Sequence, residues 1–169
     1  MAVKKTSKRN LHEYLHAALR IALGFIMLWA FLDKTFGLGF ATKPAASWLN
    51  GGSPTTGFLK FAAKGPFVEF YNSLAGNQIV DWIFMLGLLG IGLAFILGIA
   101  LRFAGFMGAL MMILMYFALM PSENNPIIDD HIINALAFLL IGSSNAGDVF
   151  GFGEAWKKSK VVKGLPFLK

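Results

Sequence analysis

Residues 79–120, IVDWIFMLGLLGIGLAFILGIALRFAGFMGALMMILMYFALM, decide the fold because two apolar runs follow one another here almost without a break. A helix of about 20 apolar residues is long enough to cross the hydrocarbon core of a bilayer. We therefore predict membrane-spanning helices over residues 79–101 and 103–120. Only a tight turn around Arg102 separates them, so we expect an antiparallel hairpin.

Two further apolar runs extend this hairpin to a predicted bundle of four transmembrane helices. They cover residues 15–36 and 127–147. The last run has a helix start signal, with Asn125 as the N-cap and Pro126 at the first helical position. The fold class expected is therefore an all-α integral membrane protein, a single domain over residues 1–169.

The composition agrees with a membrane protein. The 169-residue chain is 56% hydrophobic and 14% charged, whereas a soluble domain carries about 25% charged residues. The absence of cysteine excludes disulfides, thiolate nucleophiles and cysteine-ligated metals. No haem or metal site is predicted, since His16 and His131 lie at opposite ends of their spans. The basic residues behind the net charge of +6 are expected to contact lipid headgroups rather than nucleic acid.

The distribution of lysine and arginine predicts the orientation. Both tails, residues 1–14 and 148–169, are basic, whereas the short segment between the third and fourth spans has no lysine or arginine. By the positive-inside rule, both termini face the cytoplasm. Arg20 and Arg102 lie at the same inner end, and we expect them to extend to the cytoplasmic headgroups.

The outer loop of residues 37–78 contains its own structural signals. Phe67, Phe70, Tyr71 and Leu74 recur at helical spacing and form one apolar stripe. Short amphipathic helices lying in the outer membrane interface fit this pattern. Two roles remain open for them, a simple cap on the bundle or a lid over a ligand pocket.

Ionisable side chains gather at the predicted outer ends of the spans, and the middle of each span carries no charge. Such groups in membrane proteins usually face the bundle interior or water. We therefore predict one shared pocket at the outer mouth. The predicted catalytic residues are Asp33, Lys34, Asp130 and His131. The predicted substrate- or quinone-binding residues are Trp29, Asp81, Trp82, Asn134 and Phe138.

His131 is the most informative of these residues. The positive end of the helix disfavours its protonated form, whereas the adjacent aspartates favour it, so it suits proton exchange. Asp129 is expected to point away from the pocket, toward Ile133.

A purely structural role for the acidic residues also stays open. Residues with a carboxylate are favoured near any helix start, as are Glu123, Asp129 and Asp130. Asp33 and Lys34 can form an interfacial ion pair, and Asp81 can cap its helix.

Glycines recur in the second and third predicted spans. They are Gly87, Gly90, Gly92, Gly98, Gly105 and Gly108. Small residues allow transmembrane helices to approach closely. We expect these glycines to pack the hairpin tightly.

Four stretches of the chain carry a family resemblance. They are RIALGFIMLWAFLDKTFGLGF (20–40), WLNGGSPTTGFL (48–59), AGNQIVDWIFMLGLLGIGLAFILG (75–98) and NNPIIDDHIINAL (124–136). In these stretches the chain resembles the DoxX/DoxD family of small four-span membrane proteins. It is most similar to the DoxD type, the large subunit of thiosulfate:quinone oxidoreductase.

This resemblance implies a function. The chain would be a membrane subunit of a quinone-linked oxidoreductase of the thiosulfate type, in the cytoplasmic membrane of a prokaryote. Quinone would be a substrate from the bilayer, resting against Trp29, Trp82 and Phe138, and other respiratory subunits would be partners. The alternative that remains open is a non-catalytic accessory subunit of a larger respiratory electron-transfer complex.

Overall fold

The computed structural model describes residues 10–122 and 125–168, which form helices joined by turns and loops. The body consists of α1 (Leu11–Phe36), α3 (Gln78–Leu97), α4 (Leu101–Leu119) and α5 (Asp130–Gly142). Within the described residues, α1, α3 and α4 are long and apolar enough to cross a membrane. Helix α5 has 13 residues and is shorter than the span predicted over residues 127–147, so the count of four spans stays a prediction.

The remaining elements are short and lie at the two ends of the body. The loop after α1 contains helical turns at Pro44–Ala46, Trp48–Asn50, Phe58–Ala62 and Gly65–Phe67, followed by α2 (Val68–Leu74). The C-terminal segment contains a turn at Ala146–Asp148, α6 (Gly153–Lys157), α7 (Lys160–Gly164) and a turn at Pro166–Leu168. Helix α2 lies within the stretch where amphipathic helices were predicted, and its position in the membrane interface stays a prediction.

Local sequence signals set the ends of the long helices. Asn10 caps α1 with its side-chain oxygen, and Asn77 caps α3 in the same way. Both helices stop at a glycine with positive φ, Gly37 at 67° and Gly98 at 72°. Glycine adopts this left-handed conformation without a Cβ penalty, so it ends a helix sharply.

The helices pair as α1 with α3 and α4 with α5, and glycines allow both contacts. A Cβ atom on Gly92 would lie 2.8 Å from the backbone nitrogen of Leu28 in α1. A Cβ atom on Gly105 would lie 2.7 Å from the backbone oxygen of Phe138 in α5. The glycines of both helices were expected to pack α3 against α4. Gly87 does face α4, since a Cβ atom there would lie 2.8 Å from the Met111 side chain, whereas Gly92 and Gly105 bring their helices close to a different partner.

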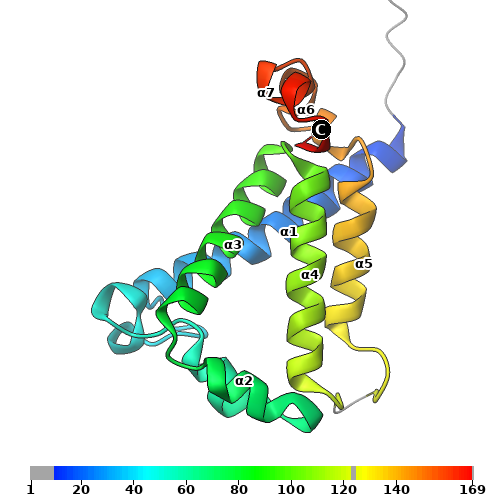
Figure 1. The fold of residues 1–169 in the computed structure, drawn as a ribbon. Coiled ribbons are helices and arrows are strands. Elements are labelled where there is room, and N and C mark those ends of the chain that lie inside the picture. The colour runs from blue at the N-terminus through cyan, green and yellow to red at the C-terminus, as the bar shows by residue number, and fades with distance from the viewer. Residues whose placement is uncertain (1–9, 123–124, 169) are drawn as a thin grey trace, which may run out of the picture.

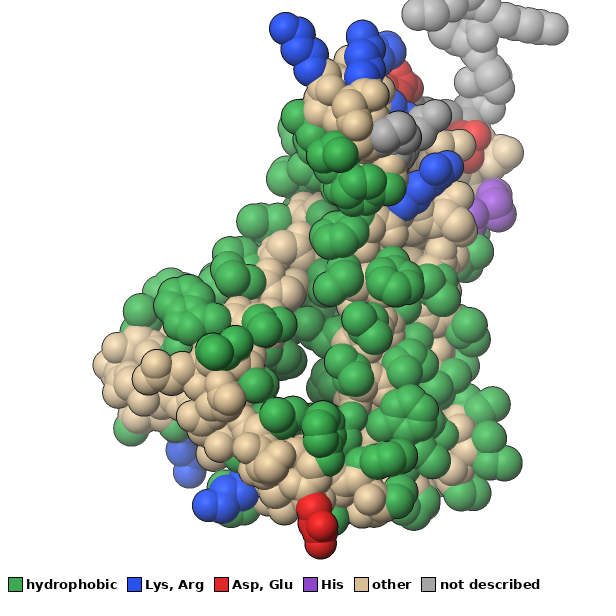
Figure 2. Space-filling view, in the orientation of Figure 1, with side chains coloured by type: hydrophobic (Ala, Val, Ile, Leu, Met, Phe, Trp, Pro, Cys, Tyr) green, Lys and Arg blue, Asp and Glu red, His purple; other side chains and the backbone are tan. Residues whose placement is uncertain are grey.

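Helices α3 and α4 meet at one end and diverge toward the other (Figure 1). They are joined by the turn at residues 98–100, and Arg102 lies within the first turn of α4 rather than at the centre of the connection. The space-filling view shows an opening between α3 and α4 above α2, which we call the hollow (Figure 2). We call the end with α2 the outer end and the end with the α3–α4 turn the inner end, following the predicted orientation.

Helix α2 and the turn before it reach from the start of α3 to α4 and close the outer side of the hollow. The Tyr71 hydroxyl donates a hydrogen bond to the Leu114 carbonyl over 2.7 Å. The backbone N–H of Lys64 donates to the Ala118 carbonyl over 2.8 Å. The loop is therefore fixed to α4 by backbone acceptors near the end of that helix.

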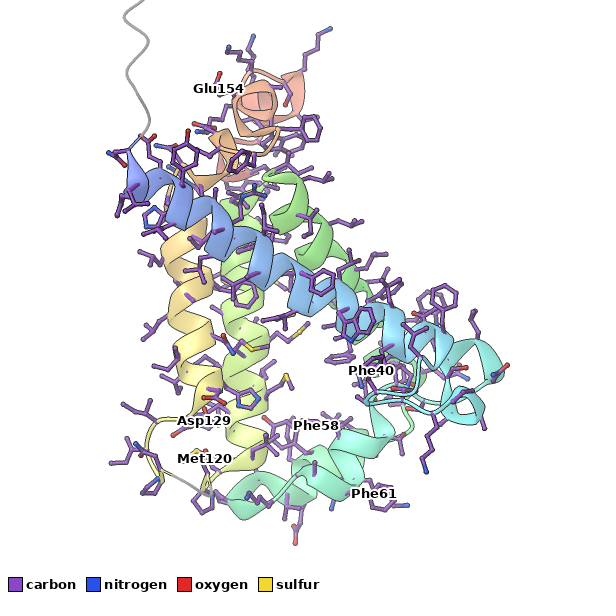
Figure 3. The ribbon with its side chains drawn as sticks, turned by 180° about the vertical axis from the view of Figure 1, so that it is seen from behind. Phe40, Phe58, Phe61, Met120, Asp129 and Glu154 are labelled. Atoms are coloured by element: carbon purple, nitrogen blue, oxygen red, sulfur yellow. The ribbon has the colours of Figure 1, made fainter. Side chains whose placement is uncertain are left out.

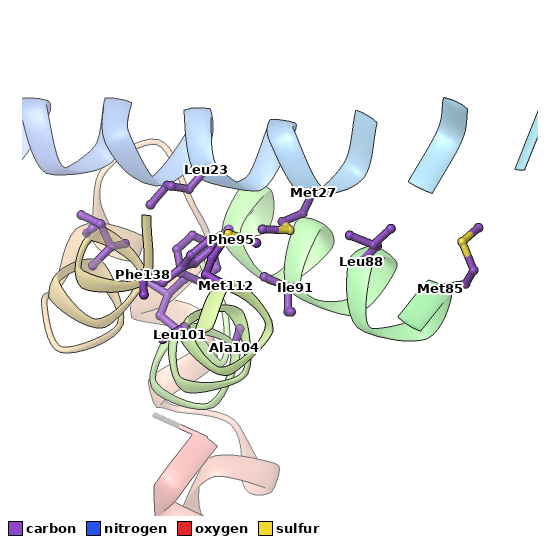
Figure 4. Close-up of a cluster of buried hydrophobic side chains, with 14 residues drawn as sticks. Leu23, Met27, Met85, Leu88, Ile91, Phe95, Leu101, Ala104, Met112 and Phe138 are labelled. Carbon is purple, nitrogen blue, oxygen red and sulfur yellow. The ribbon is translucent and has the colours of Figure 1, made fainter. Parts of the chain in front are cut away.

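The hydrophobic core lies toward the inner end, where the two helix pairs meet. Phe95 of α3 and Phe138 of α5 touch edge to face, with ring centroids 5.0 Å apart. Met112 of α4 joins them, whereas Leu88 and Met85 follow α3 away from this centre (Figure 4). The packing therefore holds the two helix pairs together at the inner end and leaves them apart at the outer end.

Arg20 corrects one prediction, since its side chain is fully buried and does not extend to headgroups. Its guanidinium donates to five backbone carbonyls, those of Phe95, Ile96, Ala146, Val149 and Phe150. The last carbonyls of a helix have no partner within that helix and carry partial negative charge. Arg20 supplies that partner for α3 and also holds the segment that follows α5.

Candidate functional site

Asp129 organises the start of α5. Its Oδ1 accepts hydrogen bonds from the backbone N–H of His131 at 2.9 Å and of Ile132 at 3.3 Å, which makes Asp129 the N-cap. Its Oδ2 lies 2.9 Å from Nδ1 of His131 and accepts from the Ser122 hydroxyl at 3.1 Å. One carboxylate therefore fixes both the helix start and the imidazole ring.

Two sequence expectations for this region are wrong. Asp129 was expected to point away from the site, but it is the residue that binds His131. Asn125 was expected to cap the helix, but its Oδ1 accepts from the backbone N–H groups of Ile127 and Ile128 in a turn before the helix. An aspartate two residues before a histidine can act as N-cap and ring partner together, and that spacing was the signal available in the sequence.

The hydrogen bonds at Asp129 also favour its ionised form. Burial raises the pKa of this carboxyl group, but hydrogen bonds from His131, Ser122 and the backbone of Ile132 lower the pKa by more than burial raises it. The pKa of Asp129 therefore lies below its ordinary value. An ionised Asp129 accepts a hydrogen bond from His131 when Nδ1 carries a proton. Nε2 is then the ring nitrogen that can form a hydrogen bond with a ligand.

A pocket of about 330 Å³ lies beside this pair. Its lining residues come from the outer loop, the end of α4 and the start of α5, and they are Lys64, Leu119, Ser122, Asn125, Ile128, Asp129, Asp130 and His131. This volume is in the range of small-molecule sites. Among the predicted catalytic residues, Asp130 and His131 line the pocket.

Asp81 belongs to a different cluster, on the α3 arm. It is 5% exposed. Its Oδ1 accepts from the Ser53 hydroxyl at 2.9 Å, the Thr55 hydroxyl at 2.5 Å and the Thr55 backbone N–H at 3.3 Å. These contacts fasten the outer loop to the first turn of α3.

Asp33 holds the same loop from the end of α1. It is 1% exposed, and its Oδ1 accepts from the backbone N–H of Phe40 at 3.2 Å. Figure 3 shows Phe40 and Asp129 on opposite sides of the hollow. The single pocket predicted from Asp33, Asp81 and His131 is therefore not formed. The two helix pairs diverge, and these residues lie in two separate clusters.

The other predicted site residues lie away from the pocket, and the aromatic ones pack against neighbouring rings. Phe138 is buried in the core against Phe95. Trp82 is largely exposed and packs edge-on against Trp48 at a centroid distance of 4.6 Å, and Trp29 lies between Phe25 and Phe40. Lys34 and Asn134 are half-buried, and neither is among the residues that line the pocket.

The described residues contain no group of three or more His, Asp or Glu side chains that could hold a metal ion. Glu123, which was expected to belong to the outer cluster, lies outside the described residues. The site therefore consists of a histidine–carboxylate pair, with Asp130 and Lys64 among the other residues that line the pocket.

These features define the class of the protein: the part of the chain that the structure describes is helical, with three helices long and apolar enough to cross a membrane and a polar pocket at one end. Comparisons of the chain with protein-family models, with curated proteins and with solved structures gave no match. The DoxX/DoxD resemblance therefore stays a prediction.

Proposed function

We propose that the chain is a membrane subunit of a quinone-linked oxidoreductase that binds the quinone head group beside the Asp129–His131 pair. The observation that carries the proposal is the 2.9 Å contact between Asp129 Oδ2 and His131 Nδ1 at the wall of a pocket of about 330 Å³. Reduction of a quinone to a quinol takes up two electrons and two protons, so the site needs a proton donor close to a quinone oxygen.

His131 fits the role of that proton donor. Asp129 orients the ring through Nδ1, so Nε2 of a protonated His131 would donate to the quinone oxygen. Asp130 is exposed at the same pocket and can return protons from the water outside. Asp33 and Lys34, which were predicted to be catalytic, have no part in this proposal because Asp33 binds the outer loop.

The hollow between α3 and α4 supports a lipid-soluble substrate. It opens between helices whose surfaces carry large exposed apolar side chains, such as Leu86 and Leu114. A quinone tail would remain among lipid chains in the hollow while the head group reaches the pocket. Two thiosulfate ions, as the resemblance implies, would supply the two electrons from the outer side by joining to each other through a new S–S bond.

The test is quinone binding by the purified full-length protein in detergent, with a short-chain quinone analogue. We expect His131→Ala and Asp129→Asn to weaken binding at least tenfold, and to slow thiosulfate-driven quinone reduction by about 10²-fold or more, the usual contribution of a general acid. His12→Ala is the matched control, because His12 is exposed on α1 at the inner end. Equal affinity in all three variants would contradict the proposal.

A second candidate function is that of an accessory subunit, and the same hollow supports it. A transmembrane helix of a partner chain would fill the space between α3 and α4 (Figure 2). Mild-detergent purification separates the two functions. Co-purification of haem- or copper-containing subunits, together with no quinone binding by the isolated chain, would favour the accessory role.

A further inference from the structure

The C-terminal segment, residues 150–168, is folded against the inner ends of α3 and α4, and we call it the foot. The Phe152 backbone N–H donates to the Leu97 carbonyl at 2.8 Å. The Phe167 ring packs on Phe103 of α4 with centroids 6.1 Å apart. Figure 1 shows α6 and α7 beyond the α3–α4 turn. The foot is therefore a fixed structure at the inner end of the spans.

The foot is also closed within itself. The Trp156 indole N–H donates to the Leu168 carbonyl at 2.6 Å, and the Ser159 hydroxyl caps α7 by accepting from the Val162 backbone N–H at 3.3 Å. These bonds join α6, α7 and the final turn. The positions of its side chains therefore define a surface rather than a flexible tail.

Three lysines of the foot are exposed, Lys158, Lys160 and Lys163. Lys157 differs from them, since its Nζ binds Asp148 Oδ2 at 2.8 Å and Asn145 Oδ1 at 2.7 Å. Figure 2 shows basic side chains extending from this end of the molecule, away from the helical body. Lys160 and Lys163 lie three residues apart on α7, which places them on neighbouring positions of one helical face.

The same foot exposes large apolar side chains beside the ends of the spans. Phe150 is 71% exposed, Phe152 62% and Phe167 56%. A surface that combines exposed aromatic rings with lysines is suited to the boundary between headgroups and acyl chains. A soluble nucleic acid would contact the lysines but would leave these rings in water.

We propose that the foot is a docking surface for anionic phospholipid headgroups, with Lys158, Lys160 and Lys163 at the phosphates and the three exposed phenylalanines among the upper acyl chains. The acidic residues of the foot region are Asp148, which is paired with Lys157, and Glu154. Arg102, exposed in the first turn of α4, adds positive charge at the same end. The proposal is independent of the quinone site at the outer end.

The experiment measures lipid retention by the full-length protein. The protein is purified in mild detergent with equal amounts of phosphatidylglycerol and phosphatidylcholine, and native mass spectrometry counts the lipids of each kind that stay bound. We expect the wild type to retain phosphatidylglycerol in preference. We expect Lys160→Gln combined with Lys163→Gln to reduce this preference about tenfold or more, because each lysine near an anionic surface contributes roughly fivefold.

The matched control is Lys43→Gln combined with Lys60→Gln, which removes the same charge from exposed positions of the outer loop. This variant is expected to keep the preference for phosphatidylglycerol. Equal loss in both double variants, or no loss in the Lys160/Lys163 variant, would overturn the proposal. Thermal unfolding of both variants checks that neither has lost its fold, and the single variant Lys158→Gln repeats the test if α7 is disturbed.

Discussion

The Nη2 atom of Arg20, on α1, donates a hydrogen bond to the backbone carbonyl of Phe150, which follows α5, over 2.9 Å. The other bonds of the same guanidinium reach the end of α3 and the segment at residues 146–149. One side chain thus joins three separate parts of the chain at the inner end. The helix pairs diverge from that point, which is why the outer-end residues separate into two clusters.

Arg20→Met is expected to destabilise the protein by about 3–5 kcal/mol, because five backbone carbonyls would lose a buried cationic donor. Arg20→Lys should recover part of the loss, since an ammonium group has three donors and cannot reach all five acceptors. Thermal unfolding in detergent measures both changes. Arg102→Met, at an exposed position of the same end, should change stability by less than about 0.5 kcal/mol, and similar effects at the two arginines would contradict this role of Arg20.

Gly92→Ala and Gly105→Ala should each destabilise the protein by about 1–3 kcal/mol, since the added methyl group meets backbone atoms of the paired helix. Unfolding by increasing sodium dodecyl sulfate measures the loss. Gly90→Ala is the control, because a Cβ atom there has nothing within 4 Å; its effect should stay within about 1 kcal/mol. A uniform response at all three positions would mean that glycine content, and not close helix approach, matters.

The contribution of Asp129 to stability should depend on pH in a defined direction. Its pKa is lower in the folded protein than in the unfolded chain, so the stabilisation is complete above the ordinary aspartate pKa of about 3.9 and declines as the pH falls below it. The difference in unfolding temperature between the wild type and Asp129→Asn, measured from pH 7 down to pH 3, should therefore shrink only in the acidic range. Asp130→Asn, at an exposed position, serves as the control; a difference that grows on acidification would have the wrong sign.

Asp81→Ala should release the outer loop from α3. The Ser53 and Thr55 donors would lose their acceptor, which costs about 1–3 kcal/mol when such groups stay buried. We expect faster protease cleavage within residues 38–56, located by mass spectrometry, and a smaller effect for Asp81→Asn because the amide oxygen still accepts. Glu69→Ala, an exposed carboxylate of α2, should leave cleavage unchanged, and a loop that is equally resistant in Asp81→Ala would refute the tether.

Some of the candidate site could be predicted from sequence and some could not. Asp130 and His131 were placed at one pocket because they are adjacent at a helix start, so their proximity is a local property. Ser122 gave no signal, and Lys64 was expected only to attract an anion from the outer loop, since each reaches the pocket through the path of a loop. Asp33 and Asp81 were grouped with His131 by their depth and by the helix face on which they lie, and neither property reports the distance between diverging helices.

The sequence by itself determined the helical class, the long apolar helices and most of their ends, because hydrophobic runs, asparagine caps and glycine stops act within a few residues. Tertiary structure decided which helices pair, where Arg20 lies and which acidic residue binds His131. These outcomes depend on contacts between residues far apart in the chain, such as Gly92 against Leu28 and Arg20 against Phe150. A periodic pattern shows which face of a helix is small or polar, and only the packed fold selects the partner for that face.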